Sequence, residues 1–316
     1  MKRQAPWRLL SLEPSVPAAP RFSGTAVIAV SSLFFAVMAV LARTLAGEVP
    51  PAQVVTVRHV IGLVGMALFF PALRRKPKLT RPWLLLLRGV LGGTAVLTYF
   101  TAIRHLGAAP ATVLNYAAPV YAAFFAAVFL KERPTRLMVV GLVLASVGAG
   151  LVAMSGDGLH LTGAGSLGAL AGLASGVAGG AAMTSIKAVR EDADAGTVFL
   201  AFSAVGLVMA APVAAPGWVP LQGAALLRVV GVGVLALFGQ MLFTWGMGHT
   251  SATVGSATTQ LVPAFAWVLA IGVLGERVTP VSVLGAAMCV AGVLLGALSG
   301  KRRSTPPKAP AAAPLE

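Results

Sequence analysis

The sequence predicts an all-α integral membrane protein in which ten transmembrane helices form two inverted repeats of five helices each. Three observations lead to this prediction. Hydrophobic residues make up 57% of the 316 residues and charged residues only 10%, whereas roughly 25% of the residues in a typical soluble domain are charged. The apolar residues form ten continuous runs, and the chain resembles itself at an offset of 144 residues.

Each apolar run contains about 20 residues, which is the length of helix that crosses a bilayer. Gly, Pro or charged residues separate consecutive runs, as expected of short connections. The first run is longer than the apolar core of a signal peptide, which has about 7–15 residues, so we expect it to be retained as a membrane helix. The expected spans are 24–45, 52–73, 83–104, 110–130, 136–155, 165–187, 195–215, 223–246, 252–274 and 280–299.

Lys and Arg are distributed unevenly between the two sides of the predicted membrane protein. With residue 1 in the cytoplasm, eighteen of the 24 Lys and Arg residues fall in cytoplasmic segments and four in outer segments. This bias predicts that both termini are cytoplasmic in a bacterial-type plasma (inner) membrane. Residues 1–23 and 301–316 are rich in Pro, Ala and basic residues and are interpreted as disordered tails. The two repeats are assigned to residues 24–156 and 165–300.

The internal repeat is clearest between residues 105–156 and 249–300, which share 16 identical residues in 52 positions without gaps. Both copies contain Leu-x-Glu-Arg-x-Thr, with a Pro thirteen residues before the Glu. The offset matches spans 4 and 5 to spans 9 and 10, so the repeat unit is five helices long. Because five is odd, the second copy enters the membrane in the opposite orientation. Inverted repeats are the architecture of carriers that open alternately to the two sides.

At these residues the chain resembles the EamA-type branch of the drug/metabolite transporter superfamily. The resemblance covers residues 24–299 and implies a ten-helix carrier, often an exporter of amino acids or other small metabolites. Lys131 departs from the pattern, because the family often has Gly at that position. The segments that carry the resemblance are Tyr99-Phe100-x-Ala102 leading to Pro119 and Leu130-Lys131-Glu132-Arg133, then Gly246 leading to Pro263 and Leu274-Gly275-Glu276-Arg277.

The function expected from these features is secondary-active transport of a small organic solute by alternating access. The sequence has no Walker A motif, so ATP is not expected to drive transport. One alternative is a non-transporting membrane scaffold or sensor. An intramembrane enzyme is a weaker alternative, because neither Gly-x-Ser-x-Gly nor His-Glu-x-x-His occurs.

Two prolines, Pro119 and Pro263, stand within the fourth and ninth predicted spans. Each removes a backbone hydrogen bond, and we expect each to bend its helix. Polar residues precede both prolines at equivalent positions. They can contact a substrate at the bilayer midplane or form hydrogen bonds between helices. These residues are Asn115 and Tyr116 in the first repeat and Thr259 and Gln260 in the second.

Three basic residues lie inside predicted spans, namely Arg58, His59 and Arg88. A cation within lipid is costly unless it is paired or hydrated. All nine acidic residues lie outside the span cores, so no carboxylate there can pair with them. Arg58 is therefore a candidate for attracting anionic or zwitterionic cargo, with snorkelling as the alternative. Arg88 is expected to snorkel to the interface, because it lies only a few residues into its span.

Further candidate substrate contacts within spans are Tyr99, Gln240 and Trp245, although each alone is more typical of packing. At the helix ends, the repeated Glu-Arg pairs can form a gating network that breaks as the repeats move. Because exposed ion pairs are weak, a structural loop contact is the favoured interpretation. The pairs are Glu132 with Arg133 and Glu276 with Arg277.

No cofactor and no metal site is expected, since Cys289 is the single cysteine. The net charge of +15 is attributed to topology and to anionic lipid rather than to nucleic acid. The expected partners are a small-molecule substrate and the lipid bilayer. Glycines recur every four residues in spans 6 and 10 and predict close helix approach, which also allows a homodimer.

Overall fold

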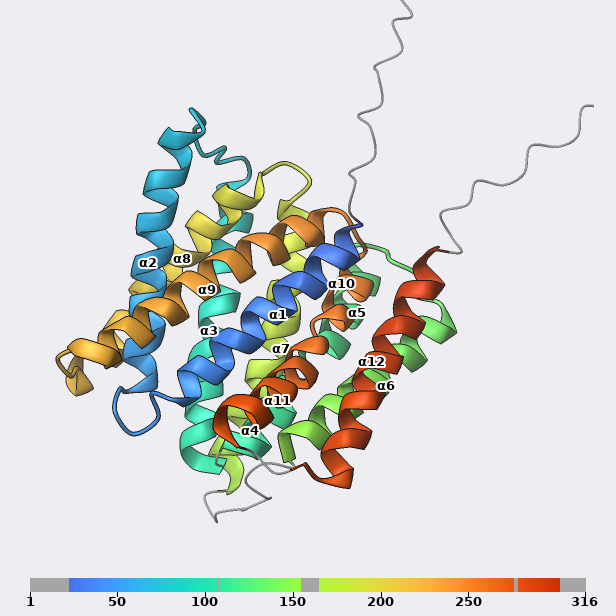
Figure 1. The fold of residues 1–316 in the computed structure, drawn as a ribbon. Coiled ribbons are helices and arrows are strands. Elements are labelled where there is room, and N and C mark those ends of the chain that lie inside the picture. The colour runs from blue at the N-terminus through green and yellow to red at the C-terminus, as the bar shows by residue number, and fades with distance from the viewer. Residues whose placement is uncertain (1–22, 107, 155–164, 276–277, 302–316) are drawn as a thin grey trace, which may run out of the picture.

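A computed structural model shows a bundle of helices (Figure 1). It describes residues 23–106, 108–154, 165–275 and 278–301, so the two predicted tails lie outside the described part except for Ser23, which caps α1, and Lys301, the last residue of α12. The predicted fold class is confirmed. The helices are α1 (Gly24–Arg43), α2 (Pro51–Ala72), α3 (Pro82–Leu106), α4 (Ala108–Asn115), α5 (Ala118–Phe129), α6 (Arg136–Met154), α7 (Gly165–Val189), α8 (Ala195–Ala214), η2 (Ala215–Gly217), α9 (Gly223–Gly248), α10 (Ala252–Thr258), α11 (Leu261–Leu274) and α12 (Pro280–Lys301).

Length and composition identify eight candidate membrane spans among the described residues. Two shorter apolar helices, Arg136–Val152 and Pro280–Gly296, complete the ten predicted spans. Many large apolar side chains point outward: Val208 and Leu227 are each 74% exposed. Water would not solvate such a surface favourably, whereas lipid does. The chain is therefore a multi-pass membrane protein.

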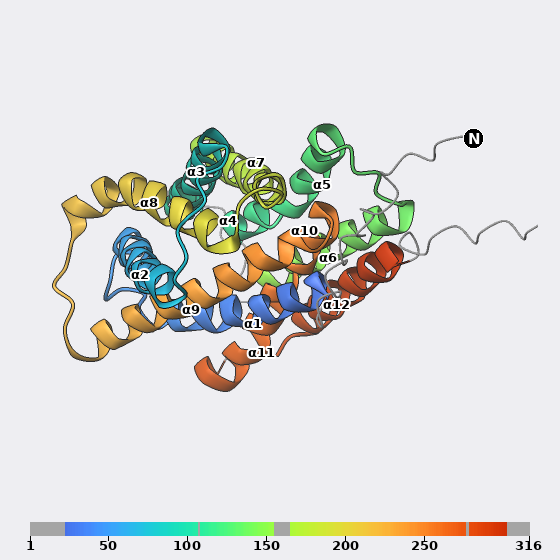
Figure 2. The same cartoon turned by 90° about the horizontal axis from the view of Figure 1, so that it is seen from above.

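The packing of the helices follows the internal repeat. A shift of 144 residues relates α1–α6 to α7–α12, and equivalent pairs of helices pack in equivalent ways. Helix α3 packs on α7 as α9 packs on α1, and α5 packs on α7 as α11 packs on α1. Two pairs consist of a helix and its own equivalent: α2 packs on α8, and α6 on α12. Figure 2 shows these two pairs toward opposite sides of the bundle.

Glycines bring α6 and α12 into backbone contact. A Cβ atom added to Gly141 would lie 2.6 Å from the Gly292 carbonyl oxygen, and one added to Gly148 would lie 2.5 Å from that of Gly285. The repeat relates Gly141 to Gly285 and Gly148 to Gly292, so the two contacts are equivalent. In α7, Gly180 lies against the Ala118 carbonyl of α5 in the same way. These glycines therefore serve close packing within one chain, and they give no separate support for a homodimer.

The fourth and ninth spans are interrupted rather than bent. Helix α4 ends at Asn115 and α5 begins at Ala118, and the equivalent break separates α10 from α11. Pro119 is the second residue of α5, and Pro263 is the third residue of α11. Proline is tolerated in a first turn, where its missing N–H would have no helical partner. The prolines thus begin new helices, which corrects the expectation of a kink within a continuous one.

The half-helices α5 and α11 end in the same backbone conformation. Lys131 has a φ of 55° and its repeat equivalent Gly275 has a φ of 66°. A left-handed residue commonly ends a helix, and Gly adopts it without steric cost. A residue with a Cβ pays about 1–2 kcal/mol there. The left-handed conformation therefore explains why Gly is typical at this position of the motif. Lys131 adopts the same conformation with backbone strain.

One end of the bundle is tightly closed. We call it the N-terminal end, because α1 begins there, as does α10, while α5, α7 and α9 end there. A fully or almost fully buried apolar cluster joins these five helices, and it consists of Ile28, Ala126, Ile186, Phe243, Met247 and Ala252. Helix α5 packs on α10 at this end. At the opposite end the equivalent helices α11 and α4 do not pack closely on each other within the described residues.

Candidate functional site

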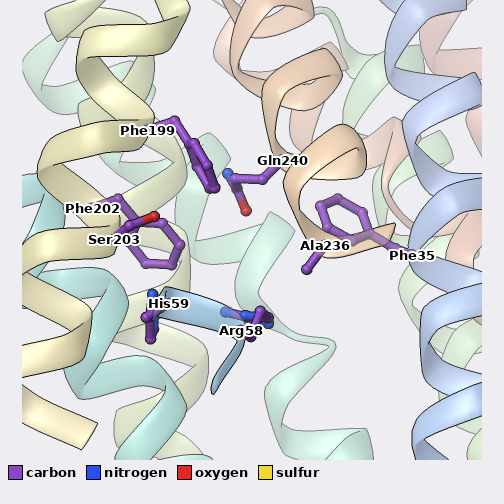
Figure 3. Close-up of a pocket in the computed structure, with 8 residues that line it drawn as sticks. All are labelled: Phe35, Arg58, His59, Phe199, Phe202, Ser203, Ala236 and Gln240. Atoms are coloured by element: carbon purple, nitrogen blue, oxygen red, sulfur yellow. The ribbon is translucent and has the colours of Figure 1, made fainter. Parts of the chain in front are cut away.

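A pocket lies between α1, α2, α8 and α9, and Figure 3 shows its side chains. Its free volume is about 10 Å³, which is room for about one water molecule. The Arg58 guanidinium and polar side chains from α2, α8 and α9 meet aromatic rings there. The lining residues are Phe35, Arg58, His59, Phe199, Phe202, Ser203, Ala236 and Gln240.

The pocket lies where α2 crosses its repeat equivalent α8. Gly62 of α2 lies against the Ser203 side chain, and its equivalent Gly206 of α8 lies against the His59 ring. Arg58 and His59 are themselves related by the 144-residue offset to Phe202 and Ser203. The backbone is therefore close to two-fold symmetric here, while the side chains are not, because at these positions only the first repeat has basic residues.

Arg88 of α3 extends this site. Its guanidinium carbon lies 4.3 Å from the centroid of the Phe202 ring, which also packs edge-on against His59. Arg88 is only 5% exposed, and its Nη1 atom lies beside Gly92, one turn further into the span. The expectation that Arg88 snorkels is thus wrong, because its side chain turns toward the middle of the membrane.

No described carboxylate neutralises these cations. Helices α1–α12 contain no Asp or Glu. Of the described acids, Glu48 pairs with Arg228, and Asp192 pairs with Arg81 at 2.9 Å. Among the described residues, the Nε and Nη1 atoms of Arg88 and the Oγ atom of Ser203 are buried and have no hydrogen-bond partner. The site therefore offers positive charge and unused donors to whatever occupies it.

Glu132 lies at the N-terminal end, between α5 and α6. Its carboxylate accepts hydrogen bonds from the backbone N–H of Ala252, at 2.6 Å, and of Thr253, at 3.1 Å. The Thr253 hydroxyl donates a third, at 2.8 Å. This carboxylate therefore ties the first repeat to the start of α10 in the second. Arg133 is exposed, and Glu276 and Arg277 lie outside the described residues.

The sequence pattern of the EamA-like transporter family matches residues 22–154 and again residues 166–297. This chain belongs to the EamA-like transporter family. The two matches fall on either side of residues 155–165, one for each five-helix half. Membership of this family confirms the resemblance inferred from the Glu-Arg motifs.

Individual relatives of this EamA-like protein are exporters by name. The pseudopaline exporter of Pseudomonas aeruginosa is 29% identical over 243 residues, 75% of this chain and 82% of that protein. A probable terminal-alkyne amino-acid exporter of Streptantibioticus cattleyicolor is 30% identical over 202 residues, 60% of this chain and 64% of that protein. A solved crystal structure shares the fold, with a TM-score of 0.77 and 19% identity over 89% of this chain and 99% of that one.

The structure separates the predicted contact residues of this EamA-like protein. Arg58 and Gln240 line the pocket together. Trp245 instead stacks on His249 with ring centroids 3.9 Å apart. Tyr116 packs against the buried cluster of Ala149, Ala264 and Cys289. The side chains of the remaining candidates take part in hydrogen bonds between or within helices, such as that of the Tyr99 hydroxyl with Thr112 at 2.6 Å. Asn115 donates to Ser175 at 2.5 Å, and Thr259 donates to the Ser256 carbonyl at 2.6 Å.

Gln260 joins the two helix breaks. Its Nε2 atom donates to the carbonyl of Tyr116, its repeat equivalent, at 2.9 Å, and to the Ser146 hydroxyl at 2.9 Å. The break after α4 leaves such carbonyls without helical partners, and a buried carbonyl must be satisfied. The geometry therefore favours interhelical hydrogen bonding over substrate contact for Gln260.

Replacing Gln260 by Ala is expected to lower the free energy of unfolding by about 1–3 kcal/mol, because it orphans the Tyr116 carbonyl in a buried place. The melting temperature in detergent measures this. Thr259→Ala is the matched control, since the Thr259 hydroxyl donates to the Ser256 carbonyl within its own helical turn. An unchanged melting temperature together with a changed substrate preference would return Gln260 to the substrate site.

Several pocket residues were not among the predicted contacts, namely Phe35, Phe199, Phe202, Ser203 and Ala236. Two of these residues, Phe202 and Ser203, could have been found from the internal repeat. The internal repeat is clearest in residues 105–156 and 249–300, but the same offset also relates α2 to α8. It pairs Arg58 and His59 with Phe202 and Ser203. His59 also lines the pocket, although it was predicted only as a basic residue within a span.

Proposed function

We propose that this EamA-like protein is a secondary-active exporter of a small organic metabolite, such as an amino acid or a related solute, and that it works by alternating access between its two repeats. The names of its relatives support export as the direction and small metabolites as the cargo. The pocket between α2 and α8 is the proposed cargo site.

The asymmetry between the two ends is the observation that carries the proposal. The buried cluster around Met247 closes the N-terminal end, whereas the repeat-equivalent helices α4 and α11 do not pack closely on each other within the described residues at the opposite end. Two inverted repeats can exchange their conformations without any new architecture. The exchanged state would open the N-terminal end and close the other, with the pocket between them.

The Glu132 carboxylate is the proposed latch of this closed end. It holds α10 through three hydrogen bonds that cross from one repeat to the other. Charge-assisted bonds of this kind are stronger than neutral ones. Within the second repeat, Lys187 of α7 donates to the Gly248 carbonyl at the end of α9, at 3.3 Å, and so holds these two helix ends together. The excess of Lys and Arg at this end supports a cytoplasmic location for it, in which case the described conformation faces outward.

Transport without ATP tests the proposal. Proteoliposomes loaded with an amino acid and small-metabolite panel are expected to exchange at least one labelled member without nucleotide, and protein-free liposomes are not. Exchange is measured by filtration and counting. If no member exchanges although the protein keeps its melting transition, the scaffold or sensor alternative replaces the transporter.

A further inference from the structure

We propose that Arg58 and Arg88 form an anion receptor, and that the cargo of this protein is an anionic metabolite bound through a carboxylate. The inference deepens the proposed function and rests on it. It goes beyond export of a small solute by naming the group that the site recognises.

The energetic cost of the two arginines is the first argument. Removing a guanidinium from water costs several kcal/mol unless a partner restores the lost interactions. Arg88 is 5% exposed, two of its nitrogens have no partner, and no described carboxylate lies within any membrane helix. A buried guanidinium without a partner therefore lowers the stability of the folded protein. A ligand that supplies a negative charge would offset the cost.

The geometry around Phe202 is the second argument. The Phe202 ring contacts both the Arg88 guanidinium and the His59 ring, and it lines the same pocket as Arg58. The aromatic ring holds a cation in place while leaving its N–H groups free to donate. The unpartnered Ser203 hydroxyl stands next to Phe202 in the chain. Guanidinium groups and a hydroxyl together match the oxygens of a carboxylate.

The departure from two-fold symmetry is the third argument. At the positions equivalent to Arg58, His59 and Arg88, the second repeat has Phe202, Ser203 and Val232. The second repeat thus forms the same helices with uncharged residues at these three positions. The fold itself therefore does not require basic residues there. Gly92 and Gly206 leave the space that Arg88 and His59 occupy.

A thermal-shift series on the purified full chain tests the inference. The probes are pairs that differ only in carboxylate against amide: glutarate with glutaramide, succinate with succinamide, and N-acetylglycine with its amide. All are compared at equal ionic strength in chloride-free HEPES, because a ligand that binds the native state raises the melting temperature. We expect at least one carboxylate to raise it and its amide to leave it unchanged.

Three variants locate the effect. Arg58→Gln and Arg88→Met are each expected to weaken binding of the responding carboxylate by about 10- to 100-fold, as loss of a charge-assisted hydrogen bond does. Arg75→Gln removes the same charge from an exposed loop and is expected to leave binding unchanged. Arg88→Met should also leave the unliganded melting temperature equal or higher, because it removes an unpaired buried cation. If Arg88 instead stabilises the fold, Arg88→Met would lower the unliganded melting temperature.

The outcomes separate this inference from the proposed function. Equal shifts from acid and amide, an equal shift from chloride alone, or no shift from any carboxylate would overturn the anion receptor. If the liposomes exchange a neutral or cationic cargo and Arg58→Gln does not affect this exchange, the exporter function is supported and the anion receptor is not. If a carboxylate binds only when both arginines are present, but no cargo is exchanged in liposomes, the anion receptor is supported and the exporter function is not.

Discussion

Replacing Glu132 by Gln is expected to open the N-terminal end of the protein. The change removes the charge that accepts three hydrogen bonds from Ala252 and Thr253, and it points an amide donor at backbone donors. Charge-assisted bonds contribute about 1.5–3 kcal/mol each, so the population of the open state should rise at least about tenfold. Met247 is fully buried in the closed cluster and serves as the reporter.

The measurement is the rate at which a membrane-impermeant maleimide labels Met247→Cys. Cys289 is itself buried and is replaced by Ala to remove background. Glu48→Gln is the matched control, since it removes a carboxylate that pairs with Arg228 instead. Faster labelling in the Glu132 variant alone supports the latch. Unchanged labelling with a lower melting temperature would make Glu132 a static clamp, the interpretation that the weakness of exposed ion pairs favours.

A single methyl group at Gly292 is expected to force α6 and α12 apart. The added Cβ would lie against the Gly141 carbonyl oxygen and 2.6 Å from the Ala145 nitrogen. Both are backbone atoms, which cannot turn aside as a side chain can. Gly292→Ala should therefore lower the free energy of unfolding by about 1–3 kcal/mol, read as a lower melting temperature in detergent.

Gly296 is the control, one helical turn further along α12. A Cβ there meets no described atom within 4 Å. Gly296→Ala is expected to be neutral or to stabilise the helix by up to about 1 kcal/mol, because Ala has the higher helix propensity. Equal losses for the two variants would show that the glycine contact between α6 and α12 is not what stabilises this pair.

Local sequence features predicted much of the architecture. Hydrophobic length located the spans, and the offset of 144 residues revealed two five-helix halves. The positions of Pro119 and Pro263 marked the interrupted spans, although the breaks precede the prolines. The pocket was predicted only in part. Arg58 and Gln240 lie in it, whereas Gln260, at an equally polar midspan position, satisfies the Tyr116 carbonyl instead.

The sequence alone determined the number of spans and the inverted order of the repeats, because the length of each apolar run and the internal repeat can be read directly from the order of the residues. Only the tertiary structure decided that Arg88 turns inward and meets Phe202, from another repeat, beside Arg58 and His59. A membrane helix is apolar toward lipid and toward its neighbours alike, so hydropathy does not show which face lies inside. The lateral packing of α2, α3 and α8 determines which face of each helix lies inside the bundle, and therefore which side chains form the site.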